Sequence, residues 1–311
     1  MPKKTPINPA DYITPLRMNG MRGRMLRLPA PKSRPKEILV VYGLHASLER
    51  MFGFAEEFNK YGAITIPDLP GFGGMDSFYK IGEQPTLDNL ADYLSSFIQL
   101  RYKRKKVTIM GMSYGFVVVT RMLQKYPKLV NKVDLVVSLA GFVHKNDFHI
   151  SKVDLYKLKF ISWLAYHRVP AFLIKTLAFR GPLIRLAYKL VSKSHRKLKD
   201  AEKEELKRRI DFEAHLWQIN DARTKGKVVY DMFQVNLCNQ QVRLPVYHVA
   251  VAEDMFFDTH AVEQHMRIIF SNFERIAVKV SGGHAPTVLA TAEEVAPFVP
   301  KRLRQLLLQK K

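Results

Sequence analysis

The amino-acid sequence predicts an α/β protein built on a mostly parallel sheet with helices on both faces. Short apolar runs rich in Val and Ile alternate with longer amphipathic stretches, and this alternation is typical of strand–helix repeats. The runs end at turn residues and are typical of strands buried on both faces. We expect strands at 37–42, 63–66, 107–110, 135–139, 245–251 and 275–280, and helices at 87–100 and 115–125. Upstream, Asn19-Gly20 predicts a tight turn between strands at 13–18 and 24–28.

Charge is distributed unevenly along the 311 residues, which carry 50 Lys and Arg against 28 Asp and Glu, a formal net charge of +22. Hydrophobic residues make up 47% of the chain, which excludes a disordered basic tail and allows a packed core. Segments 37–141 and 241–300, which hold the predicted parallel strands, carry net charges of only +2 and −3. The remaining segments, 1–36, 142–240 and 301–311, carry +8, +10 and +5. This asymmetry predicts an anionic partner or surface for the basic segments.

The basic segment 142–240 interrupts the strand–helix alternation. Its pattern indicates several helices, punctuated by Pro170 and Gly181-Pro182. We expect an α-helical cap here, inserted into a discontinuous core domain of residues 1–141 and 241–311. Such an insertion usually covers the carboxyl edge of the sheet, where ligands bind. One cap helix has an apolar face of Leu183, Leu186, Ala187, Leu190 and Val191 and a cationic face of Arg185, Lys189, Lys193 and Lys197.

Several classes of protein and site are excluded by what the sequence lacks. The single cysteine, Cys238, excludes an internal disulfide framework and a cysteine-cluster metal site. No signal-peptide pattern and no uncharged apolar stretch of about 18 residues is present, so we expect a cytoplasmic protein, soluble or peripheral at the inner membrane surface. His144, His149 and His215 form no convincing ligand set, and no dinucleotide or phosphate-binding motif occurs. The sequence therefore predicts neither a cofactor nor a metal.

The motif Gly111-Met112-Ser113-Tyr114-Gly115 lies between a predicted strand and a predicted helix. A sharp strand-to-helix turn strains the backbone at the serine, and small flanking residues let the chain pass without collision. The turn exposes the hydroxyl and aims the positive end of the helix dipole at a developing negative charge. We therefore expect Ser113 to be a nucleophile on a nucleophile elbow formed with Gly111 and Gly115.

A serine nucleophile needs a general base and an acid that orients the base. His284 lies in a Gly-rich loop just after the last predicted strand, where its imidazole can reach the carboxyl edge of the sheet. Asp254 follows the strand at 245–251 and is our candidate for the acid, with Glu253 and Asp258 as competitors. The chain order Ser113, Asp254, His284 is the order of α/β hydrolases and differs from that of other serine hydrolases.

With these motifs in place, the sequence resembles the α/β-hydrolase superfamily, in the serine hydrolase branch that carries a helical cap after the sixth strand. The resemblance extends from about Met18 to Leu307. The motifs that carry it are Tyr42-Gly43-Leu44-His45-Ala46-Ser47, Asp68-Leu69-Pro70-Gly71-Phe72-Gly73, Gly111–Gly115, Pro245–Asp254, Gly283-His284 and Glu293-Glu294-Val295. Two residues depart from the family pattern, because Tyr42 replaces the usual His and Val251 replaces the usual Gly.

The resemblance implies an α/β-hydrolase fold with a mostly parallel eight-stranded sheet. It also implies an oxyanion hole formed by the backbone N–H groups of Leu44 and Tyr114. The segment from Asp68 to Gly73 is expected to shape a loop under the site and to be structural.

Other side chains are candidates for lining the substrate pocket. They are His45, Met112, Phe142 and Trp163. His45 is equally well interpreted as a hydrogen-bonded structural histidine. The cap aromatics form either an acyl-binding roof or the core of the cap, and they are Phe148, Tyr156, Phe160, Trp163, Phe172 and Phe179.

The leading hypothesis is a serine hydrolase that cleaves a carboxylic ester through an acyl-enzyme on Ser113, with His284 as the general base and Asp254 holding its tautomer. Dehalogenases and epoxide hydrolases of the superfamily use Asp at the nucleophile position, so Ser113 argues against both. Thioesterase, amidase, carbon–carbon bond hydrolase and cofactor-free haloperoxidase activities stay open, since all use this triad.

A second hypothesis is a lipase or lysophospholipase that contacts an anionic membrane through its cationic cap. A third, non-enzymatic hypothesis is nucleic-acid binding, but no nucleic-acid module is recognisable and we expect no specific nucleic-acid partner. The expected partner is a small-molecule ester or a lipid. The sequence leaves the acyl length, the alcohol group and the oligomeric state open.

Overall fold

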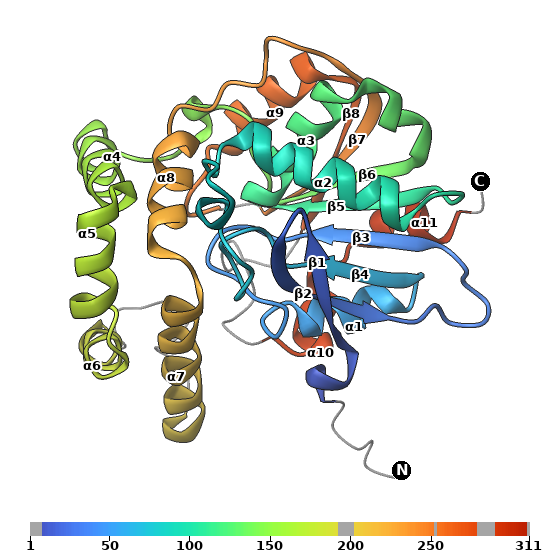
Figure 1. The fold of residues 1–311 in the computed structure, drawn as a ribbon. Coiled ribbons are helices and arrows are strands. Elements are labelled where there is room, and N and C mark those ends of the chain that lie inside the picture. The colour runs from blue at the N-terminus through green and yellow to red at the C-terminus, as the bar shows by residue number, and fades with distance from the viewer. Residues whose placement is uncertain (1–7, 192–201, 252–253, 279–289, 310–311) are drawn as a thin grey trace.

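The computed structural model describes residues 8–191, 202–251, 254–278 and 290–309 (Figure 1). Eight strands form one sheet in the order β1-β2-β4-β3-β5-β6-β7-β8. Their bounds are β1 Ile13–Met18, β2 Met21–Leu28, β3 Glu37–Val41, β4 Ala63–Pro67, β5 Val107–Met112, β6 Val133–Leu139, β7 Val242–Val251 and β8 Phe270–Val278. The β1–β2 and β2–β4 pairs are antiparallel and the other pairs are parallel. The predicted eight-stranded α/β-hydrolase fold is confirmed.

The two antiparallel strands at the edge of the sheet are joined by the turn that the sequence predicts. Asn19 and Gly20 have φ angles of 50° and 76°, and Met18 lies opposite Met21. Positive φ at both central residues is the geometry of a two-residue hairpin turn whose twist matches that of the strands. In the parallel part, every residue of β3 and β4 is buried, as expected for strands covered on both faces.

Helices cover both faces of the sheet (Figure 1). On one side lie α2 Leu87–Arg101, α3 Tyr114–Lys125 and α9 Thr259–Ile269. On the other lie α1 Phe52–Asn59, α10 Ala292–Val295 and α11 Lys301–Leu308. This division follows from right-handed crossovers between parallel strands. The short 3-10 turns are η1 Pro9–Tyr12, η2 Phe78–Ile81, η3 Pro127–Lys132, η4 Lys145–Asp147 and η6 Ala296–Phe298.

In the described part of the segment between β6 and β7, five α-helices lie in two layers (Figure 1). The outer layer, residues 152–190, contains α4 Lys152–Tyr166, α5 Arg168–Leu173, the π-helical turn η5 Ile174–Ala178 and α6 Gly181–Val191. The inner layer contains α7 Lys203–Ile219 and α8 Ala222–Met232. Helix α4 packs against α8, and α6 packs against α7. The boundaries at residues 142 and 240 that we expect for a cap domain stay a prediction.

The inner layer is joined to the core where α7 meets α8. The N–H of Gly73 donates to Asn220 Oδ1 at 2.8 Å, and the N–H of Asp221 donates to the carbonyl oxygen of Gly71 at 2.9 Å. The hydroxyls of Ser77 and Thr224 are 2.7 Å apart. The loop from Asp68 to Gly73 therefore holds the inner layer against the sheet domain.

The outer layer differs from the expectation that its aromatic side chains form an acyl-binding roof or a helical core. Tyr156, Phe160 and Phe172 are exposed. The apolar face of α6 also points outward at Leu183, Leu186 and Leu190, while Lys193 and Lys197 of the predicted cationic face lie outside the described residues. At the closest approach of α4 and α8 small residues make the contact, since a Cβ on Gly226 of α8 would lie 2.9 Å from Ala165 Cβ.

Candidate active site

Ser113 lies at the turn between β5 and α3. Its backbone has φ 50° and ψ −123°, in a region that residues with a Cβ rarely adopt. Hydrogen bonds on both sides hold it there. The N–H of Ser113 donates to the carbonyl oxygen of Leu139 at 3.0 Å, and the N–H of Phe116 donates to that of Ser113 at 3.0 Å. Strain of this kind persists only where the surrounding structure fixes it, and it concentrates at functional sites.

The two glycines of the turn allow α3 to begin directly beside other backbone. A Cβ on Gly115 would lie 2.2 Å from the carbonyl oxygen of Val41, and a Cβ on Gly111 would lie 2.6 Å from Phe116 Cα. The start of α3 therefore lies against the carboxyl end of β3. The loop after β3 is equally close to the serine, because a Cβ on Gly43 would lie 3.0 Å from Ser113 Cβ.

The two expected oxyanion donors belong to these two segments. Tyr114 is the first residue of α3, where a backbone N–H has no acceptor within the helix. Leu44 follows Gly43, whose Cα lies against Ser113. The structure thus brings the expected nucleophile and both donor residues together, while the donor role itself stays a prediction.

Asp254 lies just past the end of β7, the strand next but one to β5 in the sheet. Its Oδ1 accepts a hydrogen bond from the N–H of Phe256 at 2.8 Å. A small pocket beside it is lined by Ala140, Gly141 and His248 among others, so the carboxylate is at the carboxyl edge of the sheet. His284 and Glu253 lie outside the described residues.

The competing acid Asp258 has a different role. Its Oδ1 accepts hydrogen bonds from the N–H groups of His260 and Ala261, at 2.9 and 3.1 Å, and so caps the amino end of α9. The assignment of Asp254 as the orienting acid stays a prediction.

Comparison with known families identifies the fold family of this site. The family described as "Serine aminopeptidase, S33", a family of α/β hydrolases, matches residues 33–219, which is more than half of the chain and includes the Ser113 turn. The chain belongs to this family. Comparison with curated proteins finds no match.

Solved structures of other α/β hydrolases share the fold of this family member. MGS-M2, an α/β hydrolase enzyme from a Medee basin deep-sea metagenome library, has a TM-score of 0.66 and 15% identity, covering 96% of this chain and 98% of that one. The enol-lactonase from Burkholderia xenovorans LB400 has a TM-score of 0.63 and 12% identity, covering 95% and 100%. The epoxide hydrolase CorEH has a TM-score of 0.61 and 14% identity, covering 95% and 96%. At such identities the likeness shows the fold alone.

His45, in the loop after β3 of this hydrolase, is part of a buried polar network. Its backbone φ is 55°. Its Nε2 lies 2.8 Å from Glu213 Oε2, and Lys225 Nζ lies 3.1 Å from its Nδ1. Burial, and then the nearby Lys225 charge, lower the pKa of His45 to about 4. The neutral ring therefore donates from Nε2 to Glu213 and accepts from Lys225 at Nδ1, as a hydrogen-bonded structural histidine does.

Glu213 and Lys225 bring the inner layer into this network. Burial raises the pKa of Glu213, but hydrogen bonding from His45 and the charge of Arg50 outweigh it and hold the pKa at about 2. Burial lowers the pKa of Lys225 to about 7, and its Nζ lies 3.2 Å from the centre of the Trp217 ring. Arg50 donates both to the carbonyl oxygen of His45 and to Glu213 Oε1. The loop that carries Leu44 is thus fastened to α7 and α8.

Sequence reasoning missed Glu213, Lys225 and Arg50. His45 is separated from Glu213 by 168 positions and from Lys225 by 180. No local sequence pattern links residues so far apart, so the network becomes visible only in the folded structure.

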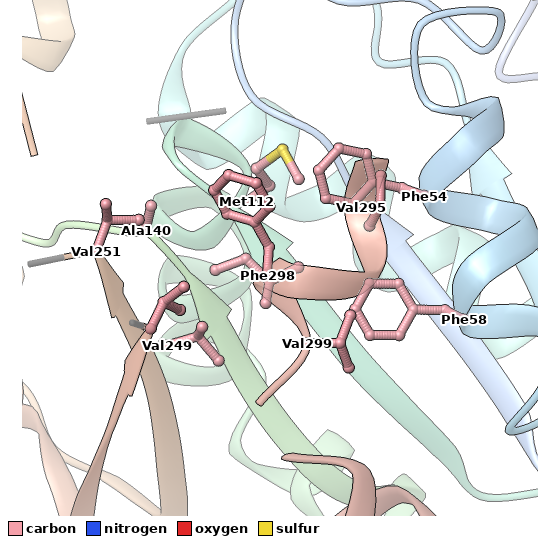
Figure 2. A pocket seen from close by; sticks show the side chains of 11 residues that line it. Phe54, Phe58, Met112, Ala140, Val249, Val251, Val295, Phe298 and Val299 are labelled. Atoms are coloured by element: carbon pink, nitrogen blue, oxygen red, sulfur yellow. The ribbon is translucent and has the colours of Figure 1, made fainter. Parts of the chain in front are cut away.

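An apolar pocket lies at the carboxyl ends of β5, β6 and β7, against α1 and α10 (Figure 2). Its lining is Phe54, Phe58, Met112, Leu139, Ala140, Val249, Val251, Val278, Val295, Phe298 and Val299. Met112, an expected pocket residue, immediately precedes Ser113. Because every lining side chain is apolar, the pocket suits a hydrocarbon group and not a charged one.

The structure places two other expected pocket residues elsewhere. Phe142 is buried in an aromatic cluster, with ring centroids 5.0 Å from Phe148 and 4.7 Å from Phe257. Trp163 is 41% exposed on α4 and contacts the rings of Phe160 and His167. Neither lines the apolar pocket.

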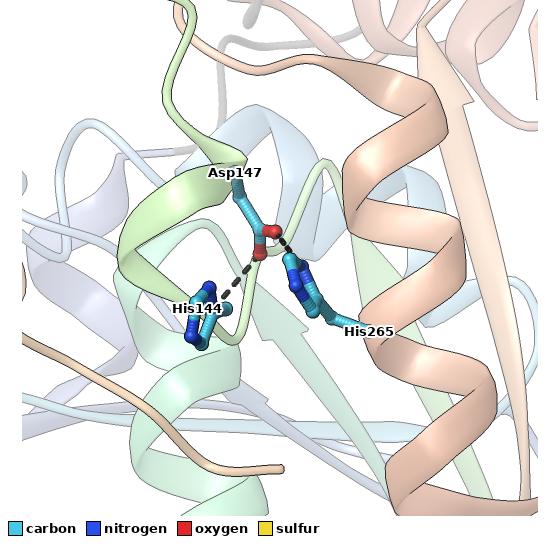
Figure 3. A group of neighbouring side chains, drawn as sticks. All are labelled: His144, Asp147 and His265. Atoms are coloured by element: carbon cyan, nitrogen blue, oxygen red, sulfur yellow. Dashed lines mark hydrogen bonds and ion pairs between the residues drawn. The ribbon is translucent and has the colours of Figure 1, made fainter.

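His144, Asp147 and His265 form a cluster whose donor atoms are close enough for a metal ion (Figure 3). Asp147 Oδ2 already accepts from the N–H groups of Val143 and His144, and its Oδ1 contacts His265 Nδ1. His144 Nδ1 accepts from the N–H of Asn146. Because these donor atoms hold the chain together at η4, the cluster is better explained as a structural cap than as a metal site.

Tyr42, the departure from the family pattern, has a structural partner. Its hydroxyl donates to Asp68 Oδ1 at 2.8 Å and accepts from the N–H of Leu69 at 3.1 Å. Arg24 donates to Asp68 Oδ2, yet burial raises the pKa of this carboxyl to about 7. The buried phenol therefore fixes the loop after β4.

Proposed function

We propose that this protein is a serine hydrolase that cleaves a carboxylic ester through an acyl-enzyme on Ser113. The observation that carries the proposal is the strained left-handed backbone of Ser113, held between β5 and the start of α3. A positive φ at a serine in this position presents the hydroxyl outside the sheet and beside the helix amino end.

The chemistry follows from the roles of the residues. Ser113 Oγ attacks the ester carbonyl while His284 accepts the hydroxyl proton, and the N–H groups of Leu44 and Tyr114 stabilise the oxyanion. The carbon–oxygen bond breaks as His284 gives its proton to the leaving alcohol. Water then attacks the acyl-enzyme with His284 as base, releasing the acid and restoring Ser113. Asp254 holds the imidazole tautomer throughout.

Two features favour ester hydrolysis over the other reactions that enzymes of related fold catalyse. The nucleophile position holds Ser113, whereas the epoxide hydrolases and dehalogenases of the superfamily use Asp. The adjacent apolar pocket suits the hydrocarbon part of an acyl group. Amides and thioesters are competing substrates that the assay below separates from esters.

The direct test is hydrolysis of p-nitrophenyl esters from acetate to decanoate, with the matching anilides and thioesters as competitors. Wild type is expected to hydrolyse the esters fastest, and Ser113→Ala is expected to lose activity. The matched control is Ser33→Ala, which removes an exposed hydroxyl and retains full activity. No turnover of any ester by folded wild type contradicts the proposal.

A lipid ester presented by an anionic membrane is the second candidate substrate. The exposed apolar side chains of the outer layer favour it. The distinguishing measurement is the rate on a lysophospholipid in anionic vesicles against the rate on a soluble ester.

A further inference from the structure

The outer layer exposes many large apolar side chains on successive helices. The exposed fraction is 63% at Val153 of α4, 67% at Val169 of α5 and 77% at Leu190 of α6. The other exposed members are Tyr156, Leu158, Phe160, Ile161, Trp163, Leu164, Phe172, Leu173, Leu177, Leu183 and Leu186. Isolated exposed apolar residues are ordinary, but so many on one layer of helices mark an interaction surface.

Several of these side chains line up along one face of their helix. On α6, Leu183, Leu186 and Leu190 are spaced three and four apart and are exposed, whereas Ile184 is buried against the protein. On α4, Val153, Tyr156 and Phe160 follow the same spacing, whereas Ser162 on another face is buried. The outer layer lies farthest from the sheet, with the inner layer between them (Figure 1). Within the part of the chain that the structure describes, the exposed apolar face of this layer is therefore not covered by the protein core.

The charges of this layer are almost all positive. Residues 151–191 contain eight Lys and Arg and one acid, Asp154. Asp211 of α7 pairs with Arg185, and Asp154 lies 3.8 Å from Lys157. Exposed Lys and Arg also lie on α4, α5 and η5, among them Lys152, Arg168 and Lys175.

We propose that the outer layer is a membrane-binding face that lies on an anionic lipid bilayer. Helices that present apolar side chains flanked by Lys and Arg bind in the interfacial plane, where the apolar groups enter the acyl boundary and the cations meet lipid phosphates. Within the described residues, no helix is long and apolar enough to cross a membrane, so this contact is peripheral.

Charge argues for lipid over two other occupants. A second copy of a chain with net charge +22 would bring two basic layers together, and their repulsion opposes that pairing. A nucleic acid would satisfy the cations but would leave the exposed Leu, Val and Phe side chains in water. Only an anionic surface with an apolar interior matches both kinds of side chain.

The test is flotation of the full chain with two kinds of vesicle. One kind contains phosphatidylcholine alone, and the other also contains about 30% phosphatidylglycerol, which makes the surface anionic. Ser113→Ala protein is measured alongside wild type, so binding is scored whether or not the proposed hydrolase function holds. We expect both proteins to bind the anionic vesicles at least tenfold more tightly than neutral ones, and less tightly at high salt.

The variant that tests the face is Val153→Ser/Val169→Ser/Leu190→Ser, with one change in each of α4, α5 and α6. The matched control is Leu100→Ser/Ile268→Ser, which removes exposed apolar side chains from α2 and α9. The triple variant is expected to lose at least tenfold in anionic-vesicle binding, while the control stays within twofold and the unfolding midpoints of both remain near wild type.

Three results overturn the proposal. The first is that wild type does not bind vesicles at low salt. The second is that the triple variant and the control bind vesicles equally. The third is that wild type is an oligomer and that the triple variant is a monomer with unchanged vesicle binding. The third result assigns the face to a second copy of the chain. Binding of duplex DNA that the triple variant retains, without vesicle binding, assigns the charge to nucleic acid and also contradicts the proposal.

Discussion

The turn around Ser113 and the outer layer of helices are built in opposite ways. At the turn, strained backbone is fixed by hydrogen bonds and by contacts that leave no room for a Cβ. In the outer layer, many large apolar side chains are exposed and the cations greatly outnumber the acids. Close packing specifies one geometry, as catalysis requires, whereas an uncovered apolar and basic face is suited to association.

The inner layer connects these two regions. Its helices α7 and α8 pack under the outer layer and also supply Glu213 and Lys225 to the loop beside Ser113. The outer layer is therefore linked, through α7 and α8, to the loop that carries Leu44. The predictions below separate the two regions, because matched changes should have large effects at one and small effects at the other.

The largest effect is expected for Asp254→Asn, which keeps the shape but removes the charge that orients His284. In a serine triad this change lowers kcat by about 10⁴-fold, because the histidine takes the wrong tautomer. Measurement of kcat on a p-nitrophenyl ester checks it. Asp258→Asn, which only weakens the cap of α9, is expected to keep most of the activity; the reverse ranking would move the acid to Asp258.

Gly115→Ala is expected to lower kcat by roughly 10²-fold or more and to lower the unfolding midpoint. The added Cβ would lie 2.2 Å from the backbone oxygen of Val41, which cannot move aside without shifting β3 or α3. The same change in the outer layer, Gly181→Ala, meets only the flexible ends of Arg185 and Gln218, at 3.0 and 3.1 Å. Kinetics and thermal melts of the two variants test the contrast, and equal effects would refute it.

Glu213→Gln is expected to lower kcat by about tenfold with little change in KM. The substitution removes the carboxylate that holds both His45 and Arg50, so the Leu44 donor loses part of its preorganisation. Asp211→Asn on the same helix breaks only the exposed pair with Arg185 and serves as the control. Unchanged kcat in a folded Glu213→Gln protein would show that the network does not position the loop.

Lys225→Met tests the same network through pH. The pKa of Lys225 in the folded protein is about 7, below its unfolded value of 10.5, so the unfolded chain binds more protons between these limits. The free energy of unfolding should therefore rise from pH 7 to pH 10, by up to about 4 kcal/mol at roughly 1.4 kcal/mol per pKa unit. Denaturant titrations should show this rise in wild type and in Lys227→Met, and a smaller rise in Lys225→Met.

Much of the sheet domain could be predicted because its signals are local. The runs Glu37–Val41 and Ala63–Pro67 are mostly apolar and buried throughout, and Asn19-Gly20 needs only its own backbone preferences to define a hairpin. The Ser113 turn is likewise encoded within five residues. Each of these features depends on neighbours in the sequence.

The helices between β6 and β7 could be predicted as helices but not placed. The spacing of Leu183, Leu186 and Leu190 shows an apolar face without saying what covers it, and the structure leaves that face exposed. Trp163 shows the same limit, because its sequence position does not reveal that its side chain lies on the exposed surface of α4 and not in the substrate pocket. The contacts of His45 with Glu213 and Lys225 depend on how α7 and α8 pack on the sheet domain, which no local pattern specifies.

The central claim, that Ser113 forms the acyl-enzyme, is tested most directly by labelling with a fluorophosphonate and mapping the modified residue by peptide mass spectrometry. We predict one label per chain on Ser113, protection by an ester substrate, and no label on Ser113→Ala, while Ser33→Ala is labelled like wild type. A folded wild type that is not labelled, or a label that falls on another serine and persists in Ser113→Ala, would contradict the account.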